Sequence, residues 1–149
     1  MDAAVDLAKK FADPKLSGVF QLTREPYEVE RAAKAADLAV FRIDIGHAHH
    51  KEELLEHLAK AMSFPAHFGK NWDALHDCLT DLDWLKAKGY VIVFEKSKHF
   101  GAGHKHDFEA ATEVLGAVAE YWHGKGKPFC AFIHGAVGWD SGLPKWPAA

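Results

Sequence analysis

The chain has 149 residues, of which 48% are hydrophobic and 26% are charged, and its formal net charge is −3. This composition is typical of one folded domain around one hydrophobic core, and it excludes a chain that is disordered throughout. The negative net charge argues against a general nucleic-acid-binding protein, because such proteins usually present a basic face to the phosphates.

The two cysteines and the lengths of the apolar runs indicate the cellular compartment in which the protein is expected. Cys78 and Cys130 both lie in apolar stretches, which favours two buried free thiols over a disulfide framework. The first ten residues lack the basic and apolar segments of a secretory signal, and no apolar run approaches the length of a membrane span. We therefore expect a cytoplasmic protein with no membrane contact.

The first 37 residues contain three short predicted elements. Residues 1–16 favour an amphipathic helix that Pro14 ends, because proline disrupts a helix interior. Val19–Leu22 is typical of a short strand, and Tyr27–Ala36 is rich in good helix formers. We expect residues 1–37 to form an N-terminal extension that packs on the main domain.

Residues 38–134 alternate between strand patterns and helix patterns. The predicted strands are Leu38–Ile45, Tyr90–Glu95 and Phe129–His134, and the predicted helices are Lys51–Met62, Asn71–Leu82 and a long helix from an N-cap at Asp107 to His123. The Tyr90–Glu95 run is continuously apolar, as in a strand that is covered on both faces. Lys96–His106 is expected to be a loop, and residues 135–149 are expected to be an irregular tail.

This order of elements predicts the fold class. Strands that alternate with helices form parallel sheets with helices on their faces. We expect an α/β fold with a small, mostly parallel β-sheet of three to four strands flanked by helices.

The segment Asn71–Asp83, with the sequence NWDALHDCLTDLD, carries most of the functional information. At about 100° per residue, its apolar residues share one arc of the predicted helix, and the opposite arc carries Asp73, His76, Asp77 and Thr80. The like charges of Asp73 and Asp77, at i and i+4, weaken an isolated helix. From these residues alone, a solvated acidic face is the favoured interpretation over a binding face.

The run FPAHFGKNWDALHDCLT, residues 64–80, closely resembles the binding loop and second helix of the barstar family of intracellular ribonuclease inhibitors. The family reads LPxYYGxNxDALWDCLT at these positions. The flanking strands and helices also occur in the family order, so that the resemblance covers about Leu38–His134. It implies a barstar-like fold in a long form with an N-terminal extension.

The resemblance also implies a function and a set of contact residues. It implies a protein inhibitor that blocks the active site of a basic, barnase-type ribonuclease, with no catalytic residues, cofactor, metal or direct nucleic-acid contact of its own, and a monomer when free. The implied ribonuclease-binding residues are His67, Gly69, Asn71, Asp73, His76, Asp77 and Glu120. Asp77 would enter the catalytic pocket, where a carboxylate offers the cationic groups the same charge as a substrate phosphate. Two residues depart from the family pattern, because His76 stands for a tryptophan and His67 for a tyrosine.

Other functions remain open at this point. The two histidine clusters are His47, His49 and His50, and His99, His104 and His106. Neither cluster includes a cysteine, and the sequence does not locate the further ligands that would complete a metal site. Surface histidines are therefore favoured over a metal site. A small hydrolytic domain would need a nucleophile or phosphate loop beside the acidic helix, and the sequence offers neither. An immunity protein for a different basic toxin would use the same acidic face.

Overall fold

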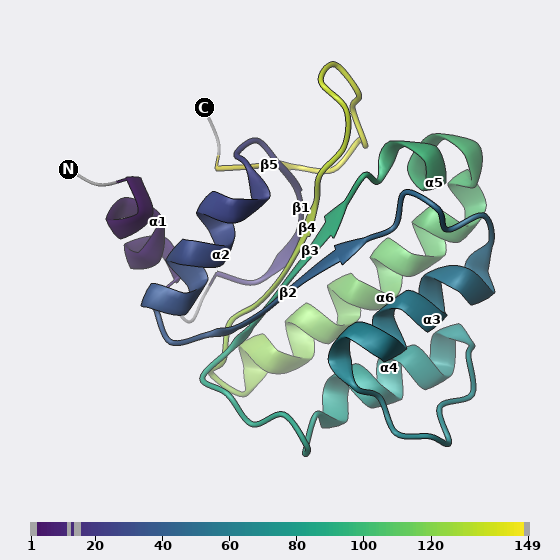
Figure 1. The fold of residues 1–149 in the computed structure, drawn as a ribbon. Helices are drawn as coiled ribbons and strands as arrows, with labels where there is room; N and C mark the ends of the chain where they lie inside the picture. Colours follow the sequence, from purple (N-terminus) through teal and green to yellow (C-terminus); the bar gives the residue numbers. More distant parts are fainter. Residues whose placement is uncertain (1–2, 12, 14–15, 148–149) are drawn as a thin grey trace.

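The computed structural model describes residues 3–11, 13 and 16–147 (Figure 1). The helices are α1 (Ala3–Phe11), α2 (Pro26–Ala35), α3 (Lys51–Met62), α4 (Trp72–Asp81), α5 (Lys98–Gly103) and α6 (Lys105–Gly124). The strands are β1 (Gly18–Leu22), β2 (Ala39–Asp44), β3 (Tyr90–Glu95), β4 (Phe129–Ile133) and β5 (Lys145–Trp146). None of the described helices is long and apolar enough to cross a membrane.

All five strands lie in one parallel sheet with the order β2-β3-β4-β1-β5. The central strands β3 and β4 are buried almost throughout, which explains the continuous apolar run of Tyr90–Glu95. The predicted α/β class with a mostly parallel sheet flanked by helices is therefore confirmed. The sheet has five strands, beyond the expected three to four, because the segment after β4 returns to add β5.

Helices cover both faces of the sheet (Figure 1). On one face, α3, α4 and α6 enclose the larger core, which includes Leu55, Leu75, Leu115 and Ile92. On the other face, α1 and α2 cover a second core that includes Leu7 and Phe132. A parallel sheet needs cover on both faces, because its alternate side chains point to opposite sides.

The first and last segments of the chain both join the sheet. Strand β1 pairs with β4 along Gly18–Gln21, and β5 pairs with β1 through Lys145 and Trp146. The expected irregular tail thus contains a strand, and Trp146 is buried against Phe11 and Phe132. The division into an extension (1–37), a domain (38–134) and a tail (135–149) stays a prediction.

Two further expectations need correction, and a third falls on residues outside the described part of the chain. The long helix begins at Lys105 with His104 as its N-cap, so that Asp107 lies in the first turn. The expected loop Lys96–His106 contains α5, which forms because Phe100 is buried and Gly101 lies directly beneath the Trp139 ring. Helix α1 ends at Phe11, whereas Pro14, the expected terminator, lies outside the described residues.

Candidate functional site: an acidic helix and its preceding loop

The loop between α3 and α4 is held by its own hydrogen bonds. The Asn71 side chain caps α4, because its Oδ1 accepts from the Ala74 backbone N–H at 2.8 Å, while its Nδ2 donates to the Gly69 carbonyl at 3.3 Å. Lys70 has a left-handed φ of 50° and donates to Glu56 on α3 at 2.9 Å. Asn71 and Gly69 therefore belong to one closed turn that fixes where the loop meets the helix.

Aromatic side chains anchor the loop from within. Phe64 and Phe68 pack edge to face with 4.9 Å between ring centroids, and Phe64 also contacts Trp84. The indole Nε1 of Trp84 donates to the Met62 carbonyl at the end of α3 at 3.0 Å. This packing ties the loop to the segments on both sides of it, so that its shape is set before any partner binds.

Helix α4 is oriented by its apolar arc. Leu75 and Leu79 are fully buried, and the Trp122 indole Nε1 on α6 donates to the Leu79 carbonyl at 2.8 Å. The predicted core arc of α4 is only partly buried, because Trp72 and Cys78 are half-buried. Because Leu75 and Leu79 face the core and α6 contacts the helix, the opposite arc of α4, which carries Asp73 and Asp77, faces outward.

The outward arc carries the acidic residues as expected. Asp73 and Asp77 are both exposed, and the Asp77 side chain keeps 85% of its accessible surface. His76 lies beside Asp77, with 3.9 Å between its Nδ1 and the Asp77 Oδ1. None of these three side chains is buried, so a partner can reach the whole arc.

A surface groove of about 390 Å³ runs between this arc and the loop. It is lined by Pro65, His67, Phe68, Gly69, Ala74, Asp77, Cys78, Asp81 and Trp84. We refer to it as the α4 groove. It brings together three of the predicted contact residues, His67, Gly69 and Asp77, whereas Asp73 and His76 lie on α4 outside its lining. Glu120 is exposed on α6, the helix that packs against α4.

Besides Pro65 and Ala74, the lining includes four residues with aromatic, thiol or acidic side chains that the sequence did not single out as contacts. They are Phe68, Cys78, Asp81 and Trp84. The i, i+4 spacing of Asp77 and Asp81 could have identified Asp81 as a second acid of the groove, since residues at this spacing are neighbours on a helix surface. Trp84 lies beyond the helix, and only the folding of the chain back toward Pro65 brings it to the groove.

The groove is electrostatically acidic. Partial burial, and then the charges of Asp81 and Asp77, raise the pKa of the Cys78 thiol above its ordinary value. Loss of solvation, followed by a hydrogen bond with Asp83, raises the pKa of Asp81. The charges of Asp77, Asp81 and Asp83 contribute to these two shifts after desolvation, so that the groove favours a cationic partner.

The cysteines and histidines form no site of their own in this region. Cys78 and Cys130 are both free, and Cys130 is buried as expected, whereas Cys78 is only half-buried. Across residues 3–11, 13 and 16–147, no group of three metal-ligating side chains could hold a metal ion.

Comparisons with known proteins give a family and a fold. A family model described as Barstar (barnase inhibitor) matches residues 38–134, and the comparison with curated proteins gave no match. A solved structure, that of the Aeropyrum pernix ORC2 protein in ADPNP–ADP complexes, is similar in fold, with a TM-score of 0.57 and 14% identity. That similarity covers 90% of this chain, but this chain spans only 40% of that one. The family model matches well over half of the chain, and it includes the loop, α4 and the α4 groove. The chain belongs to the Barstar (barnase inhibitor) family.

Proposed function

We propose that this protein inhibits a basic, barnase-type ribonuclease by placing α4 and its preceding loop in the active site of the enzyme. The observation that carries the proposal is the exposed Asp77 carboxylate, which stands on a rigidly anchored helix at the edge of the α4 groove. The family membership supports this assignment, because the family is described by inhibition of barnase.

The chemistry of the contact follows from charge and desolvation. The active site of a ribonuclease holds cationic groups that bind substrate phosphates, and a carboxylate satisfies the same hydrogen-bond donors. Asp77 would take the phosphate position, and Asp73 would face the rim of the enzyme's basic surface. His67, Gly69, Asn71 and His76 would complete the contact around the groove.

Glu120 would add a second, separate contact. It lies on α6 and is exposed, so an enzyme that covers α4 would have to extend across the neighbouring helix to reach it. A contact at Glu120 would therefore extend the interface from α4 onto α6.

The likeness to a nucleotide-bound structure carries no argument for nucleotide binding. The sequence has no G-x-x-x-x-G-K-S/T motif. After β1, the Glu28 carboxylate accepts the Glu25 backbone N–H at 3.0 Å, so that acidic side chains occupy the N-terminus of α2. We propose a binding protein without catalytic activity, monomeric when free, and active in the cytoplasm, where free thiols such as Cys78 and Cys130 stay reduced.

The test is an inhibition titration against a barnase-type ribonuclease. We expect activity to fall linearly and reach zero at one equivalent of inhibitor, and a nucleotide that occupies the enzyme's phosphate subsite should compete with binding. Full ribonuclease activity in a large molar excess of this protein would refute the proposal.

A further inference from the structure

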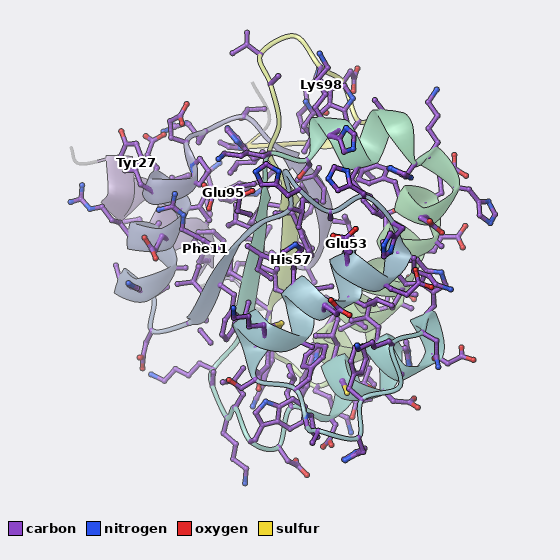
Figure 2. All side chains as sticks on the ribbon, turned by 45° about the vertical axis from the view of Figure 1, so that its right-hand side comes forward. Phe11, Tyr27, Glu53, His57, Glu95 and Lys98 are labelled. Atoms are coloured by element: carbon purple, nitrogen blue, oxygen red, sulfur yellow. The ribbon has the colours of Figure 1, made fainter. Side chains whose placement is uncertain are left out.

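A second groove lies at the carboxyl ends of β2, β3 and β4, and none of its lining residues belongs to α4. It has a volume of about 540 Å³, and the side chains that define its chemistry are His47, Lys96, Lys98, His99 and His134. We refer to it as the basic groove. Figure 2 shows Lys98 at the end of the molecule where the loop after β4 also lies. Each titratable side chain of the lining comes from a segment that directly follows one of the three strands.

Backbone hydrogen bonds hold these three strand exits together. The Ile45 N–H donates to the Glu95 carbonyl at 3.0 Å, and the His134 N–H donates to the Phe94 carbonyl at 2.9 Å. The Ser97 N–H then donates back to the His134 carbonyl at 3.0 Å. The walls of the basic groove are therefore preformed, because their backbone is a direct continuation of the sheet.

The lining contains bases and no acid. Lys96, which has a left-handed φ of 57°, donates to the Asp44 carboxylate at 3.1 Å, and Asp44 also accepts the Gly46 N–H at 2.8 Å. Lys98 forms no ion pair within the part of the chain that the structure describes. Its ammonium is thus available, in a protein whose net charge of −3 would otherwise repel an anion.

The histidines add hydrogen-bond donors to this charge. His47 and His134 line the groove from the exits of β2 and β4. The His49 Nδ1 and the His99 Nε2 lie 3.3 Å apart, within hydrogen-bond distance. This contact joins α5, which carries the lining residue His99, to the segment after β2.

We propose that the basic groove binds the phosphate group of a small phosphate monoester. Ligands of open parallel α/β sheets bind in the crevice outside the carboxyl ends of the strands, which is where this groove lies. A phosphate dianion matches a lining of one free ammonium and several imidazole N–H donors, because charge-assisted hydrogen bonds to phosphate are among the strongest available. The site is separate from the α4 groove, and it is independent of ribonuclease inhibition.

The experiment measures binding of two probes, inorganic phosphate and adenosine 5′-monophosphate, to the full chain by NMR titration at constant ionic strength. We expect chemical-shift changes at residues of the basic groove with both probes. Equal affinities indicate that the phosphate alone is recognised, and tighter binding of the nucleotide indicates that the groove also contacts the nucleoside.

Matched variants test the location of the site. Lys98→Gln should weaken phosphate binding about tenfold or more, since it removes one charged hydrogen-bond donor. The control is Lys86→Gln, which makes the same change in another groove, at the amino ends of β2 and β3, and should leave binding unchanged. Both variants should keep the wild-type melting temperature.

Three results would overturn the inference. One is an equal loss of binding in both variants, which indicates general charge attraction, and another is the absence of shifts at the groove with either probe. The third is binding of Zn²⁺ alone, abolished by His49→Ala, with no response to phosphate, which would assign the histidines to a metal. Ribonuclease inhibition by Lys98→Gln should match the wild type, so a failure here leaves the proposed function intact.

Discussion

At the residue scale, Asp77 and Cys78 are adjacent in sequence but differ in environment. Asp77 points into solvent, whereas Cys78 is half-buried beside it in the α4 groove. The helix rotation of about 100° per residue separates the two side chains. The sequence predicted the outward direction of Asp77 correctly, but it could not predict that Cys78 is only half-buried.

The environment of Cys78 leads to a prediction about thiol reactivity. Burial and the charges of Asp81 and Asp77 raise the Cys78 pKa, so that little thiolate is present at neutral pH. Alkylation by iodoacetamide should be slow at pH 7 and should accelerate only above the ordinary range of a cysteine. Asp81→Asn should shift this pH profile downward.

The buried Cys130 provides an internal comparison. Burial raises its pKa to about 12, so it should stay unmodified throughout the same pH range in the folded protein. Rapid alkylation of Cys78 at pH 7, or a profile that Asp81→Asn leaves unmoved, would contradict the acidic character of the groove.

At the element scale, the sequence predicted the long elements better than the short ones. Helix α3 and strand β3 have the predicted bounds, because an amphipathic stripe and a continuous apolar run are strong local signals. The two-residue strand β5 and the six-residue helix α5 were missed. Both depend on distant partners, since β5 pairs with β1 and Gly101 of α5 packs under Trp139.

The candidate site follows the same rule. The outward position of Asp73 and Asp77 on α4 could be predicted from helical spacing, and their role as contact residues stays a proposal drawn from the family resemblance. Trp84 and Phe68 could not be predicted, because their place in the groove depends on how the segments before and after α4 fold against each other. The sequence showed the clusters that contain His47 and His99, but it could not predict the basic groove, since three separate strand exits form it.

The extension's helices lead to a stability prediction. Helices α1 and α2 cover the sheet face that carries Val91, Val93 and Phe132. Removal of residues 1–37 deletes both helices and strand β1, so it should expose this face and yield a chain that aggregates or binds a hydrophobic dye. The milder Leu7→Ala change should lower the free energy of unfolding by about 2–5 kcal/mol, because Leu7 is 1% exposed.

Lys9→Ala is the matched control on the same helix. Lys9 is exposed, so its removal should change the free energy of unfolding by less than about 0.5 kcal/mol. Chemical denaturation of the three proteins measures the difference. Equal stability of Leu7→Ala and the wild type would mean that α1 does not contribute to the fold.

At the scale of the whole molecule, charge is unevenly distributed. Exposed acids gather on α4, whereas basic side chains gather at the carboxyl end of the sheet. A basic ribonuclease should therefore approach in an orientation that the field of α4 selects. The proposed function and the proposed phosphate site use opposite charges at different places on one small fold.

This distribution predicts a salt-dependent association rate. The Debye length is about 10 Å at 0.1 M salt, so higher salt screens the attraction between the two surfaces before they meet. Stopped-flow measurements should show an association rate that falls steeply as salt rises, with a much smaller change in the dissociation rate. An association rate that is flat across this range would exclude electrostatic docking through α4.

The most direct test of the central claim compares Asp77→Asn with Asp37→Asn in ribonuclease inhibition. Both changes remove one carboxylate charge from an exposed side chain, and Asp37, paired with Lys88, lies away from the α4 groove. Asparagine also tolerates the left-handed φ of 63° at position 37. We predict that Asp77→Asn weakens inhibition by about 2–5 kcal/mol, because the enzyme's cations lose their partner, while Asp37→Asn inhibits as the parent does. Equal inhibition by the two variants, at unchanged melting temperature, would contradict the assignment of Asp77 as the phosphate mimic.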